Sequence, residues 1–292
     1  TEDSLVAAED TNVGNESVDI QQQEPVEISE LETTENNDLS KSSESITVDE
    51  SIAEDILATQ ADTAVVVGTV SDYLTAKGDA KLYNINLPAG VYLQAQLTTP
   101  ANADLDYDLY LLDAEGNILT GSDYYTYING TAGTLPEALG YITSGDTATY
   151  YLYVLASEGG SVSESFTLDY SVSTACDSYE IDESVRQALA FTYGAGGAYI
   201  ESRNLSSPID NDWYVITVPS SRIYDKLKIS ATTASTNTCS VEVYQNVASE
   251  GYQMKRVGSG NTISVSSGKY YIRVSNAKTM ENFDDLDIQN YK

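Results

Sequence analysis

The chain has 292 residues with 45 acidic and 14 basic side chains, two cysteines, 23 tyrosines, 3 phenylalanines and no histidine. Its formal net charge of -31 argues against nucleic acid and anionic membranes as partners, because both attract a basic surface. The lack of histidine excludes Ser-His-Asp and Cys-His catalytic sites, His-ligated zinc or haem, and a histidine pH switch. The length is sufficient for about two domains.

Residues 1–60 form an acidic leader. They hold 17 of the 45 acidic residues, one base (Lys41) and no aromatic residue. Because such a segment buries too little apolar surface to offset its chain entropy, we predict that it is disordered. We interpret it either as a spacer that holds the folded part away from a surface or as a solvated tail left after signal-peptide removal. No stretch of the chain approaches about 18 apolar residues, so we predict no membrane insertion.

Short segments of alternating polar and apolar residues begin at about residue 63. The clearest of them cover residues 81–87, 91–97, 107–112, 150–155 and 165–172. A Pro-Ala-Gly turn separates the first two, and Gly, Asp, Asn and Ser are frequent between the others. Period-two segments separated by turn residues are typical of antiparallel strands in a β-sandwich or barrel.

A second set of strands is expected in the other half of the chain. It covers residues 200–205, 213–218, 227–231, 241–245, 263–265 and 270–274. The two sets align: residues 150–154 match 270–274, residues 109–110 match 243–244, and Tyr83 matches Tyr214. A duplicated β-domain of about 110 residues explains this alignment. We therefore predict an all-β chain, with tandem antiparallel, jelly-roll-like β-sandwiches at residues 61–173 and 174–292 after the leader.

Four segments carry more specific motifs. They are residues 106–113 with Gly116 (DYDLYLLD, then G), 177–184 (DSYEIDES), 210–214 (DNDWY) and 268–274 (GKYYIRV). In this order and spacing, they resemble the strand motifs of bacterial pre-peptidase C-terminal domains, and the resemblance covers about residues 63–292. The chain departs from the family at Ile181 and Asp182, where the family has Pro and Asn. The first half lacks the Y-E-P-N motif with which the family domain begins.

The resemblance implies a secreted accessory β-sandwich, usually appended to peptidases, that binds matrix protein or polysaccharide or assists secretion. It also implies calcium, because collagen-binding relatives hold Ca²⁺ where the E-P-N-D motif meets the D-x-D strand. The matching residues of this chain are Glu180, Asp182, Glu183, Asp210 and Asp212. Calcium takes about six to eight hard oxygen ligands, which two short acidic clusters at a strand edge supply. Alternatively, these acids are solvated, or Asp182 caps the turn at 183–189.

A second calcium-like pattern lies in the first half. Asp104, Asp106, Asp108 and Glu115 have the spacing of positions 1, 3, 5 and 12 of an EF-hand loop. Leu109, however, stands where that loop requires glycine, and the segment alternates like a strand. We therefore predict a strand here rather than an EF-hand.

The two cysteines, Cys176 and Cys239, both lie in the second half of the chain. In a secreted chain a disulfide between them would close a loop of 64 residues, counted inclusively, and contribute about 4 kcal/mol. The alternative is two small buried thiols. Without histidine, neither cysteine is expected to be a catalytic nucleophile.

An aromatic segment in the first half is a second candidate site. Tyr124, Tyr125 and Tyr127, flanked by Asp123 and Asn129, are expected to lie in a loop. That composition suits stacking on sugars or packing on a protein partner. The alternative is ordinary packing of the loop on its own domain.

The sequence thus favours a non-catalytic, secreted or cell-surface pair of binding modules for an extracellular protein or polysaccharide, with Ca²⁺ as the candidate cofactor. The alternative is a structural or assembly component of a bacterial surface or secreted complex, or an accessory region of a secreted peptidase. A glycosidase needs only two carboxylates, but no residue set here indicates a catalytic cleft, so we do not expect an enzyme. The sequence does not indicate an oligomeric state.

Overall fold

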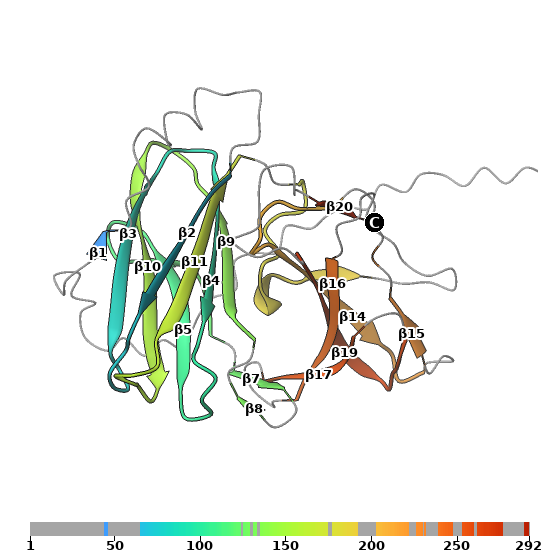
Figure 1. The fold of residues 1–292 in the computed structure, drawn as a ribbon. Coiled ribbons are helices and arrows are strands. Elements are labelled where there is room, and N and C mark those ends of the chain that lie inside the picture. Colours follow the sequence, from blue (N-terminus) through green and yellow to red (C-terminus); the bar gives the residue numbers. More distant parts are fainter. Residues whose placement is uncertain are drawn as a thin grey trace, which may run out of the picture. The chain divides into compact units, whose positions relative to one another are not determined.

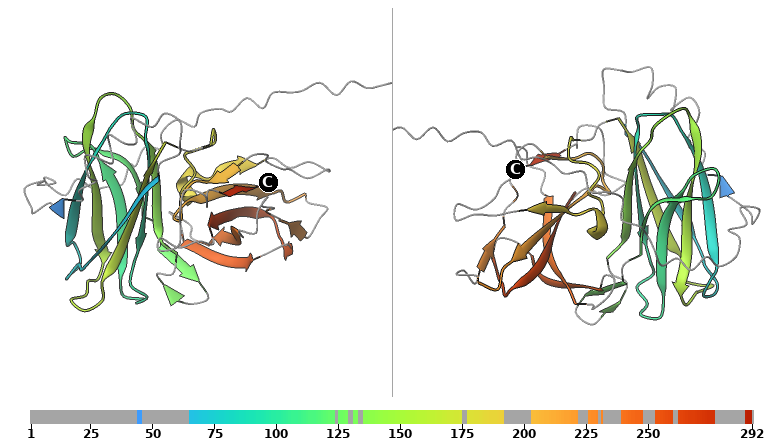
Figure 2. Two further views of the ribbon diagram at one scale, coloured as in Figure 1. Left: turned by 45° about the horizontal axis from the view of Figure 1, so that its top comes forward. Right: turned by 180° about the vertical axis from the view of Figure 1, so that it is seen from behind.

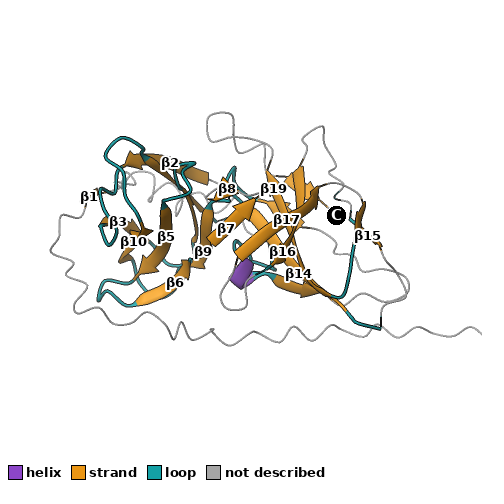
Figure 3. Ribbon diagram, turned by 90° about the horizontal axis from the view of Figure 1, so that it is seen from below, coloured by secondary structure: helices purple, strands orange, loops and turns teal. Residues whose placement is uncertain are grey.

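The structure is a computed structural model. It describes residues 44–45, 65–123, 125–128, 131–132, 135–174, 177–191, 203–221, 226–229, 231, 239–247, 253–259, 262–276 and 289–291. In these ranges the chain consists of strands and one 3-10 turn, η1 (Val185–Gln187), which confirms the all-β prediction (Figure 3). No helix in these ranges is long and apolar enough to cross a membrane. The predicted leader, residues 1–60, lies outside the described residues except for strand β1 (Glu44–Ser45).

The first sandwich, built from residues 65–123 and 135–173 with β1, consists of two facing sheets (Figures 1 and 2). One sheet has the order β1-β3-β10-β5-β6, and the other has the order β2-β11-β4-β9. The strands are β2 (Val65–Asp72), β3 (Ala80–Leu87), β4 (Tyr92–Thr98), β5 (Asp106–Leu112), β6 (Ile118–Ser122), β9 (Glu137–Ile142), β10 (Ala148–Glu158) and β11 (Phe166–Ser173). These eight strands pair with one another only antiparallel, in the strand order of a jelly roll, as predicted, and β1 adds to β3 in parallel.

Alternation along the strands builds the core of the first sandwich. On β4, Leu93, Ala95 and Leu97 point into this core and are at most 2% exposed. Because side chains alternate between the two faces of a strand, Tyr92 and Gln94 point away from the core. Both are nevertheless only 1% exposed. Another part of the chain therefore covers the outer face of β4.

The second sandwich is built on a seven-stranded sheet of order β12-β14-β19-β16-β17-β7-β8. Its strands are β12 (Leu189–Phe191), β14 (Asn211–Val218), β19 (Gly268–Asn276), β16 (Cys239–Asn246), β17 (Gln253–Ser259), β7 (Tyr125–Ile128) and β8 (Thr131–Ala132). Two small sheets pair β13 (Arg203–Leu205) with β20 (Gln289–Tyr291) and β15 (Lys226–Lys228) with β18 (Thr262–Ser264). Leu205 of β13 and Ile263 of β18 share one core with Val243 of β16, so the small sheets form the opposing layer.

The two sandwiches contain sheets with the same strand order, as the repeat seen in the sequence predicts. The order β12-β14-β19-β16-β17 matches β1-β3-β10-β5-β6, and in both sheets the first strand is parallel to the second. Tyr83 pairs with Leu152 as Tyr214 pairs with Ile272, in agreement with the predicted alignment.

The predicted alignment of β5 with β16 was wrong by two residues. Leu152 faces Leu111, whereas the equivalent Ile272 faces Val243, so Val243 corresponds to Leu111 rather than to Leu109. A two-residue slip keeps each side chain on the same face of its strand, so alternation alone cannot detect it.

The aromatic segment of the first half is a strand of the second sandwich, not a loop. Tyr125 and Tyr127 belong to β7, which runs parallel to β17 with Tyr125 paired to Gln253 (Figure 3). The loop prediction was therefore wrong for these two residues, and Tyr124 lies outside the described residues. The β7 segment, Tyr-Thr-Tyr-Ile, has strong β propensity, but only the two-residue strand β8 pairs with it nearby, and its other partner, β17, is far away in the sequence.

Candidate metal centre

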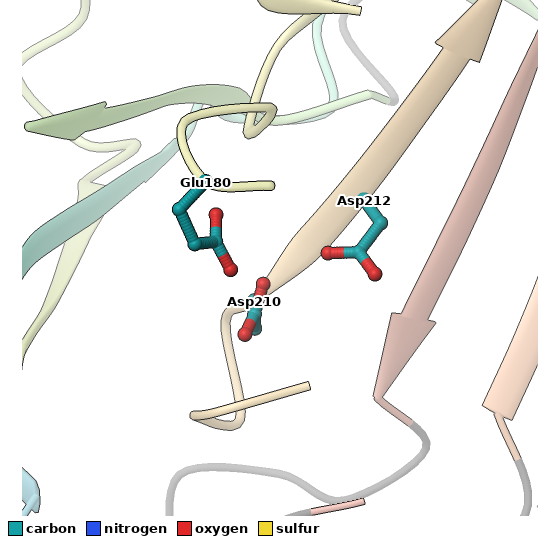
Figure 4. A group of neighbouring side chains, drawn as sticks. All are labelled: Glu180, Asp210 and Asp212. Carbon is teal, nitrogen blue, oxygen red and sulfur yellow. The ribbon is translucent and has the colours of Figure 1, made fainter. Parts of the chain in front are cut away.

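Five acidic side chains gather where the segment before η1 meets the start of β14. We call them the acid cluster: Glu180, Asp182, Glu183, Asp210 and Asp212. The carboxylates of Glu180 and Asp212 point toward that of Asp210, and oxygens of these three residues lie within 4.8 Å of one another (Figure 4). Three of the five residues predicted to hold calcium thus have carboxylate oxygens close to one another.

Backbone contacts dock the segment before η1 onto β14. The backbone N–H of Trp213 donates to the carbonyl oxygen of Asp182 at 2.9 Å. The N–H of Asn211 donates to Oε2 of Glu183 at 3.0 Å. Trp213 packs in a hydrophobic cluster with Val185 of η1, which fixes the approach of the two segments. The prediction that two short acidic motifs converge at a strand edge describes this arrangement.

The acid cluster is buried. Asp182, Glu183, Asp210 and Asp212 are at most 2% exposed, and Glu180 is partly buried. Within the described part of the chain, no lysine or arginine forms an ion pair with Glu180, Asp182, Glu183 or Asp210. Buried carboxylates are normally paired with a cation or a metal, so this group lacks the usual compensation.

Three carboxylate oxygens in the cluster accept no hydrogen bond. They are Oε1 of Glu180, Oδ2 of Asp182 and Oδ1 of Asp210, and all three are buried. The other oxygen of Asp210 accepts hydrogen bonds from the N–H and the hydroxyl of Ser206, the latter at 2.8 Å. Buried polar atoms are almost always satisfied, and a hard cation is a natural partner for several orphaned carboxylate oxygens.

Burial raises the pKa values of the cluster. It raises the pKa of Glu180 to about 8, an effect to which the charge of Asp210 adds. It raises the pKa of Asp210 to about 6, although the hydrogen bonds from Ser206 lower it. The pKa values of Asp182 and Glu183 also lie well above their usual range, because of burial and then neighbouring carboxylates. Without a cation, protons are therefore retained in the cluster near neutral pH, and a bound divalent cation would displace them.

Two residues of the first sandwich complete the site, and the sequence did not reveal them. The hydroxyl of Tyr92 lies 2.7 Å from Oε2 of Glu180 and 2.5 Å from Oε1 of Glu183. Nε2 of Gln94 donates to the same oxygen of Glu183 at 2.6 Å. A hydroxyl has one proton, so Tyr92 donates to only one of the two carboxylates at a time. In the sequence, Tyr92 and Gln94 alternate with the apolar residues of β4. This alternation indicates that they lie on the outer face of the strand, but it does not indicate which part of the chain covers them.

Two of the four EF-hand-like acids of the first half lie in a strand, as predicted, and Asp104 and Glu115 lie in turns on either side of it. Asp106 and Asp108 belong to β5, and Asp108 is only 8% exposed. The hydroxyls of Ser157 and Tyr110 each donate to Asp108 at 3.3 Å. Asp108 is therefore held by its neighbours in the first sandwich, away from the loop geometry that an EF-hand requires.

The cysteine pair is described only in part. Cys239 is the first residue of β16, and it is a partly buried free thiol. Burial raises its pKa, as expected for an inert structural thiol. Cys176 lies outside the described residues.

Comparison with known proteins identifies no family. The chain matches no family model, and it matches no curated protein. Among solved structures it is similar to PliG of Aeromonas hydrophila, a periplasmic inhibitor of g-type lysozyme, at 10% identity and a TM-score of 0.26, over 45% of this chain and 96% of that one.

Two longer matches have equally low similarity. The PBSX exported protein XepA matches at 11% identity and a TM-score of 0.28, over 77% of this chain and 84% of that one. The tandem CBM22-1–CBM22-2 domains of Paenibacillus barcinonensis Xyn10C match at 11% identity and a TM-score of 0.19, over 80% and 92%. Scores this low assign neither a family nor a ligand, so the resemblance to pre-peptidase C-terminal domains stays a prediction.

Proposed function

We propose that the acid cluster is a calcium site and that the chain is a calcium-stabilised, non-catalytic pair of binding modules. The observation that carries the proposal is the convergence of carboxylate oxygens of Glu180, Asp210 and Asp212, beside buried oxygens of Glu180, Asp182 and Asp210 that accept no hydrogen bond. The fit is chemical as well as spatial, because the donors are all oxygens and the sequence has no histidine. An oxygen-only, irregular donor set favours Ca²⁺ over zinc, and over the near-ideal octahedron that Mg²⁺ requires.

The cluster members have different roles in this proposal. Glu180, Asp182, Asp210 and Asp212 hold the cation. Glu183 has both oxygens engaged, one by Tyr92 and Gln94 and the other by the N–H of Asn211. We therefore propose that Glu183 does not bind the cation and instead links the surrounding segments through its hydrogen bonds. When bound, calcium supplies the positive charge that this buried group lacks.

The same burial favours a stabilising role over a catalytic one. Carboxylates that act on a substrate must reach it, as in glycosidases, whereas four of these five are at most 2% exposed. The modules are proposed to be secreted or on the cell surface, and to bind an extracellular protein or polysaccharide, in line with the motif resemblance. An array of glycans and matrix proteins probed with the full chain tests the ligand class.

The calcium site is tested by the melting temperature of the full chain in calcium and in chelator. With calcium at about 100 times its dissociation constant, binding stabilises by about 2.7 kcal/mol, which raises the melting temperature by roughly 5–10 °C. Asp210→Asn should lose most of this increase. Asp146→Asn, at an exposed aspartate, is the matched control and should keep it. An identical melt in calcium and in chelator would contradict the proposal.

A further inference from the structure

The acid cluster of the second sandwich is closed by a strand of the first. Tyr92 and Gln94 lie on the outer face of β4, and both contact Glu183 through hydrogen bonds. Both are 1% exposed, although they point away from the core of their own sandwich. The outer face of β4 is therefore buried by the acid cluster and its surroundings.

The amide of Gln94 is only half satisfied. Its Nε2 donates to Glu183 at 2.6 Å, whereas its Oε1 is buried and accepts no hydrogen bond. The nitrogen of the same amide contacts the cluster, so this buried and unpaired oxygen belongs to a side chain that lies against the acids. Side-chain carbonyl oxygens of Asn and Gln are common calcium ligands.

The two sandwiches pack so closely at this point that there is no room for an additional side-chain atom. A Cβ on Gly140 of β9 would lie 2.7 Å from Cγ of Glu183, 2.7 Å from Oη of Tyr92 and 2.8 Å from Cγ2 of Ile181. Gly140 neighbours β4 in the sheet, paired with Gln94. The strand next to Gln94 therefore approaches the cluster without room for a side chain at Gly140.

We propose that the side-chain carbonyl of Gln94 is a further ligand of the cation, so that the first sandwich and the acid cluster of the second hold one calcium ion between them. This inference rests on the proposed calcium site and adds a regulatory consequence. Contacts such as the ion pair of Asp123 with Arg186 join the sandwiches without a metal. The Gln94 ligand makes part of their association depend on calcium.

Calcium titration of the full chain by calorimetry tests this ligand. Gln94→Met keeps the length of the side chain but removes both polar atoms, and it should bind calcium about tenfold more weakly than the wild type. Gln94→Glu restores an oxygen ligand and should bind at least as tightly as the wild type. Gln96→Met is the matched control on the same strand face, since Gln96 contacts Asn211 at 3.4 Å rather than the cluster, and it should bind like the wild type.

The outcomes separate the two proposals. If the wild type binds no calcium, the proposed function fails, and this inference fails with it. If the wild type binds but Gln94→Met binds equally tightly, only the Gln94 ligand is overturned. If circular dichroism in chelator shows that Gln94→Met does not fold, the calcium affinity of Gln94→Glu becomes the test. Weaker calcium binding by Gln94→Glu than by the wild type would then contradict the proposal that Gln94 is a ligand.

Scanning calorimetry tests the consequence for the two sandwiches. The wild type should unfold in one transition with calcium and in two with chelator. For Gln94→Met, merging the two transitions should require about tenfold more calcium. A wild type that binds calcium but shows the same number of transitions with and without it would overturn the calcium-dependent association, while leaving the site itself intact.

Discussion

Gly140 approaches Glu183 so closely that a Cβ on Gly140 would stand 2.7 Å from Cγ of Glu183. One residue from the first sandwich thus sets the distance at which the acid cluster of the second can sit. Gly140 does not have a positive φ, so the requirement for glycine comes from space rather than from conformation.

Gly140→Ala is expected to weaken calcium binding and to destabilise the chain by about 1–3 kcal/mol, the usual cost of overpacking. The matched control is Gly258→Ala, whose Cβ would meet Cγ2 of Ile263 at 2.3 Å inside the second sandwich. Both variants should unfold at lower urea concentration, but only Gly140→Ala should bind calcium more weakly. Equal calcium affinity in the two variants would contradict the predicted role of this approach.

Tyr92→Phe removes the hydroxyl that contacts Glu180 and Glu183. Because it leaves buried carboxylate oxygens without their donor, we expect a loss of about 1–3 kcal/mol in the free energy of unfolding. Urea unfolding in calcium measures this loss. Tyr73→Phe is the control, since Tyr73 is 43% exposed, and it should change the free energy by less than about 0.5 kcal/mol. A Tyr92→Phe variant as stable as the wild type would remove Tyr92 from the site.

Asp108 predicts a pH dependence that is independent of the acid cluster. Burial, and then the charges of Asp106 and Asp123, raise the pKa of Asp108 to about 7. In the unfolded chain an aspartate has a pKa of about 3.9. The folded state therefore holds this proton more tightly, so the contribution to stability is complete below about pH 4 and is lost as the pH rises through about 7.

Asp108→Asn removes this titration and is the test. Relative to the wild type, the variant should gain stability between pH 5 and pH 8, by up to a few kcal/mol, in calcium-saturated buffer. Urea unfolding at both pH values measures the difference, and effects common to both proteins cancel. Asp113→Asn, on a largely solvated turn, is the comparison and should not gain stability over this interval. A difference between Asp108→Asn and the wild type that does not change with pH would contradict the prediction.

The ion pair of Asp123 with Arg186 predicts a calcium-independent link. Oδ1 of Asp123 lies 2.5 Å from Nη2 and 2.7 Å from Nε of Arg186, and both side chains are about three-quarters buried, at 26% and 27% exposure. A double-mutant cycle with Asp123→Asn and Arg186→Gln should give a coupling of about 1 kcal/mol. The exposed pair Lys77–Glu158, at 62% and 64% exposure, should give a smaller value. Equal couplings for the two pairs would contradict this ranking.

Local patterns in the sequence were sufficient to predict the strands and to identify the acidic residues of the cluster. The alternation of residues 81–87 predicted most of β3 and the face on which Tyr83 lies, because a strand with one buried face repeats every two residues. The acids of the cluster lie in two short motifs, and the residues within each motif are brought together by the chain itself. Their convergence then required only that the second motif begin a strand beside the first.

Contacts between distant parts of the chain were not accessible in the same way. Alternation shows that Tyr92 and Gln94 point away from the core of their sandwich, but not which segment covers them. The partner of β7 nearby in the sequence, β8, is only two residues long, and its other partner, β17, lies far away, so the segment looked like a loop. The register of β16 was uncertain by an even number of residues for a related reason: a shift of two leaves the pattern of buried positions unchanged.

The pairing of β7 with β17 sets an order of events during synthesis. Tyr125 and Gln253 are partners, yet 128 residues separate them in the sequence. At about 5–20 residues per second, β7 leaves the ribosome roughly 6–25 seconds before the strand it pairs with. During that time the nascent chain carries an unpaired edge strand, which is the type of surface that neighbouring chains on a polysome can capture. Conditions that slow translation between these two strands should therefore lower the yield of native protein more than conditions that slow it elsewhere.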